Sequence, residues 1–137
     1  MKTNNKLRVQ AYFLLGFLSL QYLLGMLTNL FVAFPENNTD LQQWEFAKTQ
    51  FMLMAHIILG ILLLVGAIML YIRAFQAKDR HWKIASGIGL GSILLAILSG
   101  SEFISTQSEY YSLVMSLLFI LAVGAFGWGI YQSNDSK

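Results

Sequence analysis

Four long apolar runs divide the chain, at residues 11–34, 51–72, 84–104 and 110–131. Apart from Glu102, which lies close to one end of the third run, these segments contain no Lys, Arg, Asp or Glu. Each has about 20 residues or more, the length that a helix needs to cross a hydrocarbon core of ~30 Å. The pattern predicts four transmembrane helices in a single domain that takes up residues 1–137.

The polar connections between the runs are short, at residues 35–50, 73–83 and 105–109. Helices joined so tightly pack as antiparallel neighbours. Pro35 follows the first run directly and favours a helix end there. We therefore expect an all-α fold, an integral membrane antiparallel four-helix bundle in up-down-up-down order.

Basic and acidic residues are concentrated in different connections of the chain. Of the nine Lys and Arg residues, all but Lys48 fall at the two chain ends or in the second connection: Lys2, Lys6, Arg8, Arg73, Lys78, Arg80, Lys83 and Lys137. Most acidic residues belong to the other side: Glu36, Asp40, Glu45, Glu102 and Glu109. By the positive-inside rule, both termini are expected in the cytoplasm. Together with the small size and short termini, this favours a multi-pass protein of a bacterial plasma membrane.

Composition supports a membrane protein and narrows the chemistry. The chain is 56% hydrophobic and 12% charged, whereas soluble domains have roughly 45–50% and about 25%. This excludes a soluble enzyme and a disordered segment. The net charge of +2 is too small to indicate nucleic acid as a partner. Because the chain has no cysteine, disulfides, zinc–cysteine sites, iron–sulfur clusters and covalently attached haem are excluded.

Small residues mark two faces of the third predicted helix. The first face repeats at spacings of four and three: Ala85, Gly89, Ser92, Ala96 and Ser99. The second carries Gly87 and Gly91. In lipid, small residues show where helices meet. Close packing inside one bundle accounts for both faces, and the second is also a candidate contact for a second copy or another membrane protein. One functional hypothesis is therefore a non-catalytic accessory subunit.

A polar stripe on the first helix is formed by Gln21, Gly25, Thr28 and Asn29, which fall within one arc of about 100°. We expect this stripe to face the bundle interior. His56, in the second helix, is an ionisable residue inside a span and hence a candidate functional residue.

Counting residues from the expected outer boundary places His56, Asn29, Ser99 and Met115 at a similar depth of about 6–8 Å. In a bundle of consecutive neighbours the second and fourth helices are diagonally opposed. His56 and Met115 are therefore candidate metal ligands to haem b. Gly60 would leave room for the edge of the macrocycle, and Asn29, Gln21 or Thr28 could accept the other imidazole N–H.

Two other interpretations remain open. A neutral His56 could simply form a hydrogen bond with Asn29 or Ser99, and Met115 could be ordinary packing, since the chain has six methionines. A proton path could begin at His56, Glu102 and Glu109, but no acidic residue lies deeper in any span. A proton pump or coupled transporter is therefore not favoured.

The segment 55–60, with His56 and Gly60 separated by three apolar residues, resembles membrane b-type cytochromes and each four-helix half of haem A synthase. Residues 44–46 and 98–100 are also similar to the latter. The resemblance, mainly to the second helix, implies a four-helix unit that holds haem near its outer face with His56 as ligand. That family has a second His on its fourth helix, whereas this chain offers Met115, and the family's acidic residue has no clear match.

The resemblance therefore supports a haem-binding redox protein that exchanges electrons with a quinone or a partner complex. It does not support an enzyme, and the sequence offers no set of catalytic residues. This is the second functional hypothesis, beside the accessory subunit.

Overall fold

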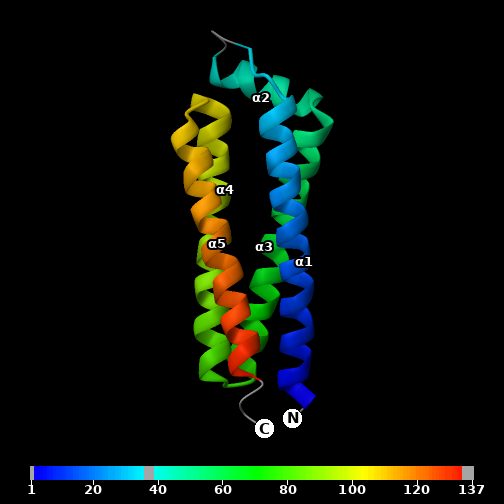
Figure 1. Ribbon diagram of the computed structural model, residues 1–137, viewed down its shortest axis with the longest axis vertical. Coiled ribbons are helices and arrows are strands. Elements are labelled where there is room, and N and C mark those ends of the chain that lie inside the picture. Colours follow the sequence, from blue (N-terminus) through cyan, green and yellow to red (C-terminus); the bar gives the residue numbers. More distant parts are fainter. Residues whose placement is uncertain (1, 36–38, 134–137) are drawn as a thin grey trace.

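The computed structural model describes residues 2–35 and 39–133, which form five helices joined by short connections (Figure 1). They are α1 (Lys2–Phe31), α2 (Asp40–Thr49), α3 (Phe51–Gln76), α4 (Arg80–Thr106) and α5 (Glu109–Gln132). All except α2 are long and apolar enough to cross a membrane, so the chain is a multi-pass helical membrane protein, as the sequence predicts. Glu36 and Lys137, which contribute to the predicted charge asymmetry, lie outside the described residues.

The spans continue beyond the predicted runs where the chain is polar. α1 begins at Lys2 instead of residue 11 and ends at Phe31 instead of residue 34. The predicted connection 73–83 is mostly helical, since only residues 77–79 separate α3 from α4. The side chain of Asp79 caps α4 by accepting a hydrogen bond from the backbone N–H of Trp82 at 3.1 Å. The length of each apolar run matches the thickness of the hydrocarbon core of the bilayer. The hydrogen-bonded helices themselves continue beyond that core.

The predicted first connection contains the short helix α2. The backbone N–H of Thr39 donates to Oε1 of Gln42 at 2.9 Å at its start. Ala47 on α2 is buried with Leu53 of α3 and Ile104 of α4, which attaches α2 across one end of the bundle. Hydropathy does not reveal this element, because its composition is mixed and its length far too short for a span.

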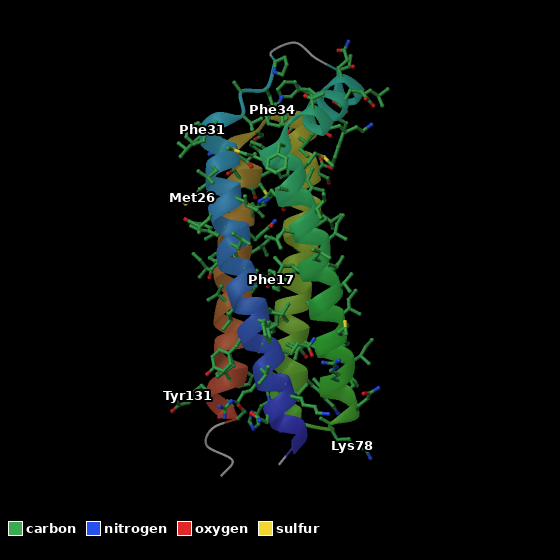
Figure 2. All side chains as sticks on the ribbon, turned by 90° about the vertical axis from the view of Figure 1, so that its right-hand side faces the viewer. Phe17, Met26, Phe31, Phe34, Lys78 and Tyr131 are labelled. Carbon is green, nitrogen blue, oxygen red and sulfur yellow. The ribbon has the colours of Figure 1, made fainter. Side chains whose placement is uncertain are left out.

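Each long helix packs against two others: α1 against α3 and α5, and α4 against α3 and α5. In Figure 1 the start of α1 and the end of α5 lie at one end of the bundle and α2 lies at the other. Figure 2 likewise places Lys78 and Tyr131 at the first end and Phe31 and Phe34 at the second. We call the part near α2 the α2 half (residues 19–35, 39–60 and 94–121) and the rest the terminal half.

The main hydrophobic core lies entirely in the terminal half. Its buried members come from all four long helices: Leu7, Ala11, Leu14, Leu18, Leu63, Ala67, Leu70, Ala74, Trp82, Ala85, Ile93, Ala122, Phe126 and Ile130. α4 and α5 approach closely here because Gly89 faces the ring of Phe126 and Gly129 faces Trp82. The predicted small face of α4 is confirmed as a packing face in this half, where its first three residues are buried.

Candidate functional site

His56 lies at the contact between α1 and α3, and so does Gln21. The Nε2 atoms of the two side chains are 3.2 Å apart, within hydrogen-bonding distance. Two glycines make room for them. A Cβ on Gly25 would lie 3.0 Å from Cε1 of His56, and one on Gly60 would lie 3.2 Å from Nε2 of Gln21. Each helix therefore inserts one polar side chain over a glycine of the other.

This reciprocal arrangement follows from a repeat that the sequence analysis missed. Gln21 and Gly25 are four residues apart on α1, and His56 and Gly60 are four apart on α3. In antiparallel helices, a polar residue followed by glycine one turn later places each polar residue level with the other helix's glycine. The repeated pattern could have been found from the sequence.

The protonation of this pair follows from its geometry. A glutamine Nε2 only donates, so with the amide oriented as described, Nε2 of His56 accepts and the imidazole proton is on Nδ1. Turning the amide by 180° would reverse both roles, because Oε1 of Gln21 would then accept from His56. In either orientation, Nδ1 of His56 and one amide atom of Gln21 remain available.

Three buried polar atoms of this region have no hydrogen-bond partner: Oε1 of Gln21, Nδ1 of His56 and Oγ1 of Thr28. The Thr28 side chain is only 7% exposed. Thr28 is one turn beyond Gly25, so the three residues lie within about 10 Å along the axis of α1. We call Gln21, Thr28 and His56 the polar layer. Unpaired polar groups are rare in protein interiors and expensive in a bilayer.

Met115 is level with the polar layer but belongs to the α4–α5 contact. A Cβ on Gly100 would lie 3.3 Å from the Met115 sulfur. One turn nearer the terminal half, the ring of Tyr22 on α1 stacks on that of Phe119 on α5, with centroids 4.8 Å apart. The structure thus brings Met115 and the polar layer to one level, where His56 packs against α1 and Met115 against α4.

One of the predicted site residues is placed differently from what the sequence suggested. Asn29 is exposed, so the expectation that it faces the interior is wrong. At about 100° per residue, Asn29 lies roughly 40° beyond Gly25 around the axis of α1. This position is just outside the part of the helix surface that contacts α3, which is narrower than the predicted stripe. Gly60 faces the Gln21 side chain, and its role beside a macrocycle stays a prediction. Ser99, beside Gly100, is half-buried.

Far fewer side chains are buried in the α2 half than in the terminal half. On α5 no residue from 109 to 121 is buried, although α5 has α4 and α1 as neighbours. On α4 none is buried from 94 to 103. In Figure 1 the backbones of the α4–α5 pair and the α1–α3 pair are farther apart here than at the terminal end, and the stacked rings of Tyr22 and Phe119 lie between α1 and α5. The α2 half therefore lacks the close packing that buries the core of the terminal half.

The two glutamates considered for a proton path do not belong to the polar layer. Glu102 and Glu109 are both exposed, near the α2 end of the bundle. Among residues 2–35 and 39–133 there is no group of three or more His, Asp or Glu side chains that could hold a metal ion. The polar layer is a set of hydrogen-bonding groups at the α1–α3 contact, and Met115 and Gly100 lie at the α4–α5 contact.

Comparison with protein family models, curated proteins and solved structures finds no match to this chain.

Proposed function

We propose that the protein is a non-catalytic accessory subunit of a bacterial plasma membrane, with its spans in up-down-up-down order and both termini in the cytoplasm. The distribution of charge supports this orientation. Lys6, Arg73, Lys78 and Arg80 are all exposed at the terminal end, whereas Asp40 and Glu45 are exposed on α2. A cytoplasmic terminal half satisfies the positive-inside rule.

The observation that carries the accessory role is the open surface at Gly91, in the middle of α4. No atom lies within 4 Å of a Cβ built on this residue, whereas one on Gly87 would lie 3.5 Å from Cε2 of Tyr71 on α3. In lipid, an outward glycine allows a helix of another subunit to approach the backbone closely. The occupant is a helix of a second copy or of another membrane protein.

Crosslinking in native membranes tests this role. Gly91→Leu fills the open surface, and we expect it to abolish the crosslinked species. Gly16→Leu is the matched control, because Gly16 also has no atom within 4 Å of a built Cβ but lies on α1. An unchanged crosslinking pattern in Gly91→Leu would contradict the proposal.

A second candidate function is a haem-binding membrane redox protein, with haem b near the outer face and a quinone or partner complex as its electron donor or acceptor. The buried, unpaired Nδ1 atom of His56 and the low burial of the α2 half favour it. His56 and Met115 would hold the iron, which requires the sulfur of Met115 to turn from Gly100. A bound haem would supply one-electron redox chemistry.

An absorption spectrum tests the haem candidate. Protein extracted from haem-supplied cells should be red, with a Soret band that disappears in His56→Ala. A colourless and fully folded preparation would exclude it.

A further inference from the structure

We infer that the α2 half is a binding site for a lipid-soluble ring compound with oxygen substituents, of the quinone and hydroquinone class. The polar layer of Gln21, Thr28 and His56 would bind the oxygen atoms. This inference concerns the bundle interior and does not depend on subunit docking at Gly91.

The unpaired atoms define the chemistry of the ligand. As oriented in the structure, they comprise a donor at Nδ1 of His56, an acceptor at Oε1 of Gln21, and the hydroxyl of Thr28, which can act as either. A quinone oxygen accepts a hydrogen bond from an N–H or O–H group. A hydroquinone hydroxyl can also donate a hydrogen bond to an amide oxygen. One ring oxygen can thus be recognised in both redox states.

The surroundings explain why the ligand must be largely apolar. The polar layer lies within helices that are exposed to lipid along most of their length, including large side chains such as Leu23, Ile58 and Leu117. A molecule that reaches this layer from the bilayer must dissolve in lipid. At the same level the α4–α5 contact contains Gly100 and Met115, and a polarizable sulfur contacts rings favourably.

A quinone would use atoms that the present contacts of the polar-layer side chains leave unpaired. Nε2 of His56 is already paired with Gln21, and the sulfur of Met115 packs on Gly100. Ligation of haem iron by these two residues would need the sulfur of Met115 to leave Gly100, whereas a ring oxygen would bond to atoms that are now unpaired, once the side chains that enclose them move aside. The geometry therefore favours a hydrogen-bonded ligand over a metal-bound one.

The test uses the full-length protein in lipid nanodiscs with decylubiquinone as the probe, and binding is measured by equilibrium dialysis. Thr28→Val removes only a hydroxyl at nearly constant volume, and Gln21→Leu and His56→Phe remove the other two groups. We expect each variant to weaken binding by about three- to tenfold, the effect of one lost hydrogen bond. Ser92→Ala is the matched control, because it removes a hydroxyl of the terminal half that already bonds to the Ile88 carbonyl.

A folding measurement accompanies the binding assay. Because Thr28→Val removes an unpaired buried hydroxyl, this variant should resist denaturation by dodecyl sulfate at least as well as the unmodified protein. The quinone should stabilise the unmodified protein more than it stabilises Thr28→Val.

Three results would overturn the inference. The first is an absence of saturable decylubiquinone binding, and the second is binding that is equal in all three variants or equal for decylbenzene, which has no oxygen. The third is a Soret band that disappears in His56→Ala, which would assign the site to haem. Loss of crosslinking in Gly91→Leu bears only on subunit docking, so the two proposals can fail separately.

Discussion

Substitution of Gly89 by alanine tests the packing of α4 against α5. A Cβ at this position would overlap the ring of Phe126, which is 0% exposed. The ring is enclosed by the core of the terminal half and has no free direction in which to turn. Either α4 and α5 separate slightly or Phe126 leaves its preferred rotamer. Overpacking of this kind lowers stability by about 1–3 kcal/mol, and we expect Gly89→Ala to do so.

The free energy of unfolding can be measured in mixed micelles by titration with dodecyl sulfate, with circular dichroism as the readout. Gly91→Ala is the matched control, two residues away on the same helix, with no atom within 4 Å of the new methyl group. Its unfolding free energy should change by no more than about 0.5 kcal/mol. Replacing Phe126 by leucine removes the overlap, so the double variant Gly89→Ala/Phe126→Leu should show a favourable coupling of at least about 1 kcal/mol.

Two results would refute this reasoning. If Gly89→Ala and Gly91→Ala unfold at the same dodecyl sulfate fraction, the close approach of α4 and α5 at Gly89 does not exist. If the effects of Gly89→Ala and Phe126→Leu simply add, the two residues are not in contact.

Three further predictions concern topology and polar contacts. The chain has no cysteine, so single-cysteine variants report sidedness: in intact cells an impermeant maleimide should label Thr49→Cys and not Lys78→Cys, and the reverse result would invert the proposed orientation. Gln10→Leu removes both the bond from Gln10 Nε2 to the Gly66 carbonyl and the bond that Gln10 accepts from an arginine of α3. It should lower the unfolding free energy by about 1 kcal/mol in the same titration, and an unchanged midpoint would show that these bonds contribute nothing. Gln43→Ala removes the bond that attaches α2 to the preceding connection; amide hydrogen exchange should become faster in α2 alone, and faster exchange throughout the bundle would contradict this local role.

The four spans were predictable because lipid imposes a simple requirement of length and apolarity, independent of how the helices pack. The ends of the spans were less predictable. Residues 2–10 and 73–83 are polar but mostly helical, since the helices extend beyond the region that hydropathy detects. α2 was missed because its stability comes from Ala47 packing on two other helices, a contact that no local pattern reveals.

The candidate site was predictable in part. Gln21, which the sequence suggested as a hydrogen-bond acceptor for a haem-ligating His56, does lie within hydrogen-bonding distance of His56, although its donor atom Nε2 faces the imidazole ring. Asn29 was misplaced because a 100° stripe is wider than the face that one neighbouring helix covers. That Met115 packs on Gly100 could not be predicted, because residue counting gives the depth of a side chain but not the neighbour toward which it turns.

The concentration of the hydrophobic core in one half has a consequence for local unfolding. The free energy of local opening increases with the apolar area that the opening exposes. Fluctuations that part the helices should therefore begin beneath α2, while Trp82 and Phe126 hold the opposite end together. A solute from the surrounding lipid would then enter sideways between transiently separated helices, without unfolding of the molecule as a whole.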